Sequence, residues 1–213
     1  MKIMLFGKDG QLGWELQRSL APLGNLVALS RSSEQLCGDL TDLNGIARTI
    51  QIEKPDVIVN AAAYTAVDRA QTEPELCHTI NSLAPEVMAA QAQRIGAWMV
   101  HYSTDYVFDG SGSLPWTEMD LPAPLNEYGR SKAEGERRVG LACARHLILR
   151  TSWVYADRGA NFLRTMLRLA QERDQLSVVS DQWGAPTRPA LSADVTSHVL
   201  RAASQRPAPA PPP

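Results

Sequence analysis

The sequence has no basic excess, no long apolar run and no cysteine pattern, and each absence excludes a class of protein. Its formal net charge of -2 at pH 7 gives no electrostatic basis for binding nucleic acid. No apolar run approaches the roughly 20 residues that a membrane-spanning helix needs, and the apolar start of the chain is too short for a signal peptide. The cysteines stand in no metal-ligand spacing, so we expect no metal site and reduced thiols at Cys37, Cys77 and Cys143. A cytoplasmic protein without a nucleic-acid or membrane partner is expected.

Short apolar runs alternate with amphipathic ones along most of the chain. The short runs predict strands at 3–6, 26–29, 57–59, 98–102, 147–149 and 176–179. The longer runs predict helices at 12–21, 43–50, 85–95, 131–143, 162–172 and 192–203. Strands that are apolar on both faces and separated by helices are typical of a parallel sheet covered on each side. Right-handed crossovers then give an α/β fold with a doubly wound, Rossmann-like parallel sheet.

Two stretches interrupt this alternation. Residues 103–127 contain several glycines and prolines and show neither a helical nor a strand period, and a loop of that length in a compact domain is usually functional. Residues 205–213 are rich in proline and have no large apolar side chain to bury, so we expect a disordered tail there.

The first predicted strand runs into a glycine-rich turn at the start of a helix. Gly7, Gly10 and Gly13 have the spacing G-x-x-G-x-x-G, one residue wider than the common G-x-G-x-x-G. Glycine allows a tight turn and a close approach of backbone amides to a pyrophosphate, and the helix N-terminus attracts the same anion. An ordinary strand-to-helix turn is the alternative, but the position directly after the first strand favours a dinucleotide site.

The end of the second predicted strand indicates which dinucleotide binds. An NAD site usually has an acid there to hold the ribose 2′-hydroxyl, whereas this chain has Ser30 and Arg31. A guanidinium favours a 2′-phosphate, so we predict NADPH as the cofactor, with NADH as the less favoured choice. The alternative is that Arg31 is a solvated loop residue.

Tyr128 and Lys132 stand four residues apart, on one face of a predicted helix. A free tyrosine has a pKa of about 10, and a nearby ammonium is expected to lower the pKa of the phenol toward the working range. At the end of the fourth strand, Ser103 or Thr104 can donate a hydrogen bond to a substrate carbonyl, although hydroxyls there also cap strand ends. In combination with the glycine turn, these residues predict a catalytic site.

Six segments in this order resemble the extended short-chain dehydrogenase/reductase family: 5–13, 55–68, 101–108, 124–129, 149–155 and 181–187. Within that family, the chain resembles the reductases that act on dTDP-4-dehydrorhamnose. The resemblance implies reduction of the C4 ketone of dTDP-4-dehydro-6-deoxy-L-mannose to dTDP-L-rhamnose, a sugar donor for the cell envelope. It also implies that Tyr128 donates the proton, that Lys132 assists it and bonds the nicotinamide ribose, and that Thr104 bonds the keto oxygen.

The resemblance and the residue patterns together give the expected contacts of both ligands. The expected cofactor-binding residues are Gly7, Gly10, Gln11, Leu12, Gly13, Ser30, Arg31, Asp39, Leu40, Ala61, Ala62, Ala63, Tyr64, Thr65, Tyr102, Tyr128 and Lys132. The expected contacts of the nucleotide-sugar substrate are Thr104, Asp105, Tyr106, Trp153, Val67 and Asp68. Asn81 is expected either to join a proton relay, as in short-chain dehydrogenases, or to be an ordinary helical asparagine.

Members of the family continue past residue 200, which affects the domain prediction. We expect residues 1–204 to hold the NADP(H)-binding domain with part of an incomplete substrate-binding region, so that cofactor binding is predicted ahead of turnover. A homodimer is a further expectation. Some members dimerise through acidic residues and a metal, but Ala190 stands where the resemblance predicts an acid beside Glu15, so that mode is not expected here.

Two other functions fit the same fold. One is a non-catalytic NADP(H)-binding regulatory subunit, which need not keep Thr104, Tyr128 and Lys132 together. The other is a nucleotide-sugar epimerase or dehydratase of the extended family. A dehydratase usually has a glutamate after the acid that follows its catalytic threonine, and Tyr106 occupies that position here. Because one fold hosts many chemistries, the fold alone does not decide between these functions.

Overall fold

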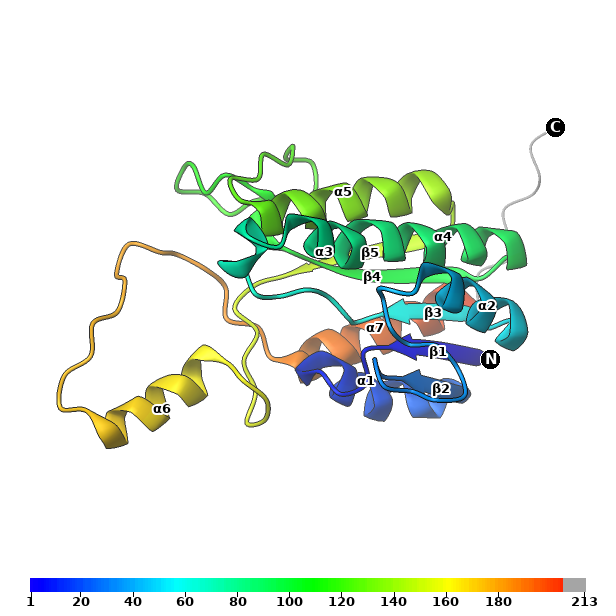
Figure 1. The fold of residues 1–213 in the computed structure, drawn as a ribbon, viewed down its shortest axis with the longest axis horizontal. Coiled ribbons are helices and arrows are strands. Elements are labelled where there is room, and N and C mark those ends of the chain that lie inside the picture. The colour runs from blue at the N-terminus through cyan, green and yellow to red at the C-terminus, as the bar shows by residue number, and fades with distance from the viewer. Residues whose placement is uncertain (205–213) are drawn as a thin grey trace.

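Five parallel strands form one sheet in the order β2-β1-β3-β4-β5 (Figure 1). The structure is a computed structural model, and it describes residues 1–204. The strands are β1 (Lys2–Phe6), β2 (Asn25–Leu29), β3 (Val57–Asn60), β4 (Trp98–Thr104) and β5 (His146–Thr151). Ile3 of β1 lies opposite Leu26 of β2 on one side and Val57 of β3 on the other. The predicted doubly wound α/β fold is confirmed.

Helices cover both faces of the sheet. The side chains of β1 alternate between the two faces, and each set is buried in one of two apolar cores. Ile3 and Leu5 pack toward the core shared with α1 (Gln11–Leu20) and α7 (Pro189–Ser204). Met4 and Phe6 pack toward the opposite core, which includes residues of α2 (Leu43–Glu53), α4 (Ala84–Ile95) and α5 (Glu127–Ala142). All four of these β1 side chains are fully buried.

The strand order places a topological switch point between β1 and β3. The chain leaves β1 toward β2 on one side of the sheet and leaves β3 toward β4 on the other. Ligands of such sheets bind outside the carboxyl ends of the strands at this point. The loops that follow β1 and β3, residues 7–10 and 61–68, therefore frame the expected cofactor site.

Two parts of the predicted secondary structure need correction. The prediction missed α3 (Pro74–His78) and the π-helical turn η3 (Thr79–Leu83), which precede α4. The predicted strand at 176–179 is wrong, because Leu176, Val178 and Val179 are exposed and pair with no strand. A single bridge between Val154 and Thr187 is the only pairing outside the named strands of the described chain.

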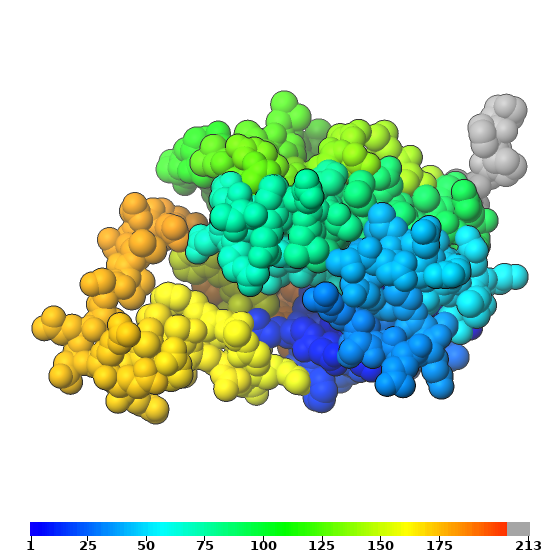
Figure 2. Space-filling view, in the orientation of Figure 1, coloured from blue at the N-terminus to red at the C-terminus, as the bar shows by residue number. Residues whose placement is uncertain are grey.

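The residues around α6 (Phe162–Glu172) stand apart from the sheet. No residue of α6 is buried, and Figure 2 shows α6 and the segment after it as a lobe at one side of the molecule. No helix within residues 1–204 is both long and apolar enough to cross a membrane. The predicted disordered tail, residues 205–213, lies outside the described residues.

Candidate active site

The glycine turn after β1 is tight enough that two of its glycines cannot be replaced without strain. Gly7 has a φ of +88°, and a Cβ there would lie 2.7 Å from the backbone nitrogen of Ala62. A Cβ on Gly13 would lie 1.9 Å from the carbonyl oxygen of Gly7. Gly10 differs, since its Cβ would meet only the Gly7 carbonyl, at 3.5 Å. The turn therefore brings its backbone close to the loop that follows β3 and leaves space beside Gly10.

The helix that follows the turn is open to an anion. Gly10 precedes α1 in an extended conformation, and no side chain caps the N-terminus of the helix. Uncapped N–H groups and the helix dipole attract negative charge at this position. The turn and the open helix end together have the features that binding of a pyrophosphate requires.

The loop before α6, residues 156–161, contacts the first turns of α1, and the sequence analysis did not predict this contact. The Gln11 amide donates to the carbonyl of Ala160 at 3.3 Å, and Asn161 Nδ2 donates to Gln11 Oε1 at 2.9 Å. The Arg158 guanidinium stacks over the Trp14 ring, 3.6 Å from its centre. This loop therefore borders the expected pyrophosphate position. The one local sign in the sequence was an asparagine directly before the apolar start of a helix.

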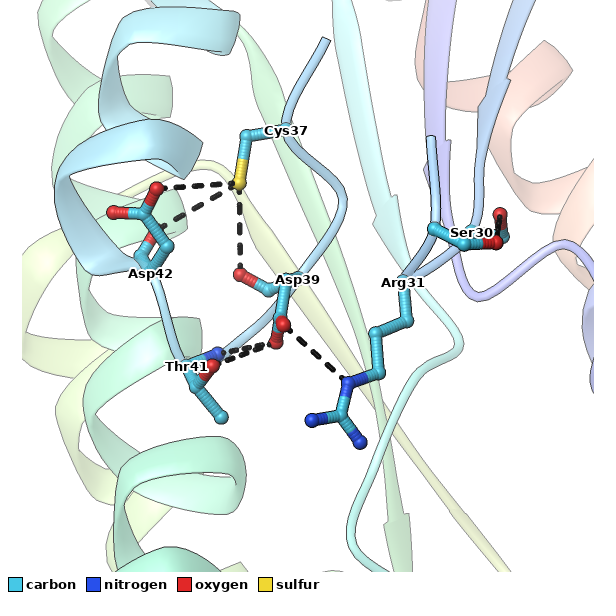
Figure 3. A network of polar contacts seen from close by, with 7 residues as sticks. Ser30, Arg31, Cys37, Asp39, Thr41 and Asp42 are labelled. Atoms are coloured by element: carbon cyan, nitrogen blue, oxygen red, sulfur yellow. Dashed lines mark hydrogen bonds and ion pairs between the residues drawn. The ribbon is translucent and has the colours of Figure 1, made fainter. Parts of the chain in front are cut away.

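A network of polar contacts at the end of β2 includes Arg31, the residue predicted to bind the 2′-phosphate (Figure 3). The Arg31 side chain is 81% exposed, and its Nε lies 3.3 Å from Asp39 Oδ2. Asp39 Oδ1 accepts hydrogen bonds from the backbone and hydroxyl of Thr41. A cavity of about 470 Å³ is lined in part by Arg31, Asp39 and Arg48. Leu40 is buried in the core, so its side chain is not free to contact a ligand.

Asn81 joins the loop after β3 to helix α5. Its Oδ1 accepts from the backbone N–H of Tyr64 at 2.9 Å, and its Nδ2 donates to the Tyr64 carbonyl and to Ser131 Oγ, both at 3.0 Å. These bonds engage both ends of a fully buried amide. They favour a structural tie over the alternative of a proton relay. The tie sets the position of residues 61–65, the expected nicotinamide side.

Tyr128 is held at the first turn of α5, beside the end of β4. Asn126 caps the helix by accepting from Gly129 N at 2.7 Å. A Cβ on Gly129 would lie 2.2 Å from the Tyr106 carbonyl, so the helix start packs directly on η4 (Asp105–Val107). Burial raises the pKa of Tyr128 to about 12, and a hydrogen bond with the Thr104 side chain opposes that rise. Tyr128 is therefore a protonated acid at neutral pH.

Lys132 does not act on Tyr128 as the sequence predicted. Its Nζ is buried, donates to the Tyr102 carbonyl at 2.6 Å and lies 3.3 Å from His101 Nε2. Burial lowers the pKa of Lys132 to about 8, while the charge of Glu136 raises it. The prediction that Lys132 lowers the Tyr128 pKa is wrong for the protein without cofactor. Burial of the phenol is the largest influence on that pKa, and it raises it.

Tyr102 contributes its carbonyl to the site and not its ring. The ring packs in the core beneath α1 and α7, on the opposite face of the sheet from His101, because successive strand side chains alternate. Its hydroxyl bonds Thr196 Oγ1 at 2.5 Å. The prediction that Tyr102 lines the nicotinamide side therefore holds at most for its backbone.

We expect Tyr102→Phe to lower the free energy of unfolding by about 1 kcal/mol, the usual net contribution of one hydrogen bond. The loss is small because the Thr196 hydroxyl keeps its bond to the Ser192 carbonyl at 2.8 Å. Urea unfolding of the variant measures the change, and NADPH binding should be unaltered. A large loss of NADPH affinity would show that the ring itself contacts the cofactor.

The predicted substrate residues divide into two groups. Asp105 lies beside Thr104, whose Oγ1 donates to its Oδ1 at 3.1 Å, and Ser152 donates to Asp105 Oδ2 at 2.5 Å. Tyr106 meets the Tyr128 ring edge-on, with ring centres 5.6 Å apart. Within residues 1–204, no hydrogen bond or aromatic ring contact joins Trp153, Val67 or Asp68 to this group.

Trp153 has an unusual backbone for a large residue. Its φ of +43° lies in the left-handed region, and the residue is 47% exposed. A Cβ on Gly184 would lie 2.5 Å from the indole, so residue 184 passes directly over the ring. Strained backbone of this kind is common at ligand sites. The geometry places Trp153 where the segment after α6 returns to the sheet.

Comparison with known proteins gives consistent matches over nearly the whole chain. The family model described as RmlD substrate binding domain matches residues 1–210. A dTDP-4-dehydrorhamnose reductase of Escherichia coli strain K12 is 56% identical over 207 residues, which are 97% of this chain and 69% of that protein.

Two solved structures have the same fold and a related sequence. A dTDP-4-dehydrorhamnose reductase of Clostridium acetobutylicum superposes with a TM-score of 0.90 at 38% identity, over 96% of this chain and 71% of the other. A dTDP-4-dehydrorhamnose reductase of Bacillus anthracis, solved in complex with NADP, has a TM-score of 0.87 at 37% identity, over 94% and 70% of the two chains.

Proposed function

We propose a function on the premise that this chain belongs to the RmlD substrate binding domain family. The proposed function of the chain is that of an NADP-dependent oxidoreductase that reduces the C4 ketone of dTDP-4-dehydrorhamnose to give dTDP-L-rhamnose. The observation that carries the mechanism is a half-buried, protonated Tyr128 whose pKa is influenced by the Thr104 side chain, at the same sheet edge as the open glycine turn. An acid beside a second hydroxyl donor is what a ketone reduction requires of the protein.

NADPH, when bound, supplies the hydride that adds to C4 of the sugar. The chain's residues must then hold the ketone and deliver one proton. We propose that Thr104 donates a hydrogen bond to the keto oxygen and that Tyr128 gives its phenolic proton to the same oxygen as it becomes an alkoxide. Because an alkoxide is a stronger base than a phenolate, Tyr128 can protonate it even with a raised pKa. The product is the C4 hydroxyl, and solvent returns the proton to Tyr128.

The turn at Gly7–Gly13 and the start of α1 would hold the pyrophosphate of the cofactor. Ala61, Ala62 and Ala63 have small side chains after β3, and we propose that they allow the nicotinamide to approach. Lys132 would bond the nicotinamide ribose. We further propose that α6 and residues 173–188, which lie at one end of the molecule (Figure 1), belong to the substrate-binding region. Trp153 is included because it is exposed and lies directly against Gly184 of that segment.

Arg31→Ala should weaken NADPH binding about tenfold or more and leave NADH binding nearly unchanged. A charge-assisted hydrogen bond to the 2′-phosphate is worth about 1.5–3 kcal/mol, and 1.4 kcal/mol is a tenfold change in affinity. The exposed ion pair with Asp39 contributes little to stability, so the variant should fold normally. Titration calorimetry with each cofactor measures the two affinities, with Arg48→Ala as the matched control in the same cavity. Equal losses for both cofactors would contradict a role for Arg31 in reading the phosphate.

The proposed function is tested by mixing the purified chain with NADPH and dTDP-4-dehydrorhamnose and following cofactor oxidation. We expect oxidation only when both ligands are present. A regulatory subunit would bind NADPH without oxidising it, and an epimerase would convert the sugar without net oxidation of the cofactor. Either of those results would refute the reductase assignment.

A further inference from the structure

The loop before α6 holds an arginine, Arg158, against the open end of α1. The side chain of Gln11, the first residue of α1, bonds this loop at Ala160 and Asn161. Gly159 has a φ of +72°, and a Cβ there would lie 2.8 Å from Gln11 Cγ, so the loop backbone passes directly over the Gln11 side chain. Arg158 is therefore fixed beside the helix end that follows the glycine turn.

The ring of Trp14 holds the guanidinium of Arg158. The guanidinium carbon lies 3.6 Å from the centre of the ring, and within residues 1–204 the guanidinium forms no ion pair and no hydrogen bond. A helical side chain leans toward the N-terminus of its helix, so the half-exposed Trp14 ring covers the first turn of α1. A guanidinium stacked on a ring keeps the N–H groups at its edge free to donate.

The protein's own charges do not account for a cation at this place. A cation beside the N-terminus of a helix is disfavoured by the helix dipole, and the first turn of α1 has no acidic residue to offset this. Asp9 and Asp157 are exposed, and neither forms an ion pair in the described part of the chain. Glu15 pairs with Arg18 at 3.3 Å. The helix end and the guanidinium thus offer positive charge to an anion that both can contact.

We propose that Arg158 is a cofactor-binding residue, held by Trp14 and Gln11, whose guanidinium donates hydrogen bonds to the pyrophosphate of the dinucleotide. Guanidinium groups bind phosphate oxygens strongly, often through two N–H groups at once. NADPH and NADH share the pyrophosphate, so Arg158 strengthens the binding of both, whereas Arg31 acts on the 2′-phosphate alone. This role rests on the proposed function, because it assumes that the pyrophosphate lies at the glycine turn.

Two fragments of the cofactor separate the roles of the two arginines. ADP-ribose carries the pyrophosphate without the 2′-phosphate, and adenosine 2′-monophosphate carries the 2′-phosphate without the pyrophosphate. We expect Arg158→Met to lower the affinity for ADP-ribose about tenfold or more, the usual effect of losing a charge-assisted hydrogen bond, and to leave adenosine 2′-monophosphate unaffected. Arg31→Ala should give the opposite pattern. Titration calorimetry measures these affinities, and unchanged binding of ADP-ribose by Arg158→Met would overturn the proposal.

A second pair of variants separates the charge of Arg158 from its packing in the loop. Arg158→Lys keeps the positive charge, so it should retain more affinity for ADP-ribose than Arg158→Met. Salt should weaken ADP-ribose binding less steeply in Arg158→Met than in the unaltered protein, because one fewer charge is screened. Equal losses in the two variants with an unaltered salt dependence would show a packing effect and would overturn the proposal.

Trp14→Leu tests whether the ring positions the guanidinium. We expect a smaller loss of ADP-ribose affinity, about threefold, as for the loss of an exposed cation–π contact. In a protein that already carries Arg158→Met, the same substitution should have no further effect, because residues that act as a unit are not additive. Fully additive losses would contradict the positioning of Arg158 by Trp14.

Arg94→Met is the matched control for removing one positive charge. Arg94 is exposed in the last turn of α4, where the helix dipole favours a cation. That turn leads into the start of β4, at the opposite edge of the sheet from the glycine turn. The control should change neither the ADP-ribose affinity nor its salt dependence. A loss as large as that of Arg158→Met would show an effect of net charge and would overturn the proposal.

The NADPH oxidation assay distinguishes this role of Arg158 from the proposed function. If the variants bind ADP-ribose as expected but the chain does not oxidise NADPH in the presence of the sugar, the proposed function falls and the role of Arg158 stands. If NADPH is oxidised and Arg158→Met binds ADP-ribose as tightly as the unaltered protein, the function stands and the role of Arg158 falls.

Discussion

Tyr128→Phe should lower the rate of NADPH-dependent reduction by about 100- to 10,000-fold, the usual contribution of a positioned general acid. The ring would keep its half-buried place edge-on to Tyr106, because only the hydroxyl is removed. NADPH affinity should therefore change little, and the loss should be in kcat. Steady-state kinetics together with a cofactor titration separate these two effects.

Tyr102→Phe is the matched control for that experiment. It also removes a buried tyrosine hydroxyl, but that hydroxyl bonds Thr196 in the core on the other face of the sheet. The control should keep nearly all of the activity. Equal activity in both variants would show that Tyr128 is not the proton donor.

Gly13→Ala should prevent the turn after β1 from forming and abolish cofactor binding. The added Cβ would lie 1.9 Å from the Gly7 carbonyl oxygen and 2.7 Å from its carbonyl carbon, and both are backbone atoms that cannot move aside alone. We expect the free energy of unfolding to fall by about 3 kcal/mol, at the upper end of the usual cost of overpacking. Denaturant unfolding measures this loss directly.

Gly10→Ala gives a contrasting result at the next glycine of the motif. A Cβ there makes only an ordinary contact with the Gly7 carbonyl, at 3.5 Å, so the protein should keep its stability. The methyl would instead stand where the pyrophosphate approaches, and NADPH affinity should fall. Normal NADPH binding by Gly10→Ala would mean that the cofactor does not pass over this turn.

The parts of the fold that the sequence predicted well are those set by local pattern. The sheet strands at 3–6 and 57–59 are apolar on both faces, and the glycine turn follows from spacing and position. The strand predicted at 176–179 had the same local composition, but no neighbouring strand lies beside it. Composition alone cannot supply that pairing partner.

The parts of the site that the sequence could not give depend on contacts between distant residues. The pairing of His101 with Lys132 joins residues separated by 31 positions, and it follows from how α5 lies on β4. The direction of the Tyr102 ring depends on the register of β4, and the raised pKa of Tyr128 depends on burial. The residue types were readable from the sequence, but their environments came from packing.

Transfer of deuterium from the cofactor to the sugar tests the central claim most directly. The chain would be incubated with dTDP-4-dehydrorhamnose and NADPH that carries deuterium at both C4 positions of the nicotinamide, and the nucleotide sugar would be analysed by NMR. We predict dTDP-L-rhamnose with deuterium bound to C4 of the sugar. A sugar without deuterium at C4, recovered from a protein that still binds NADPH, would contradict the account.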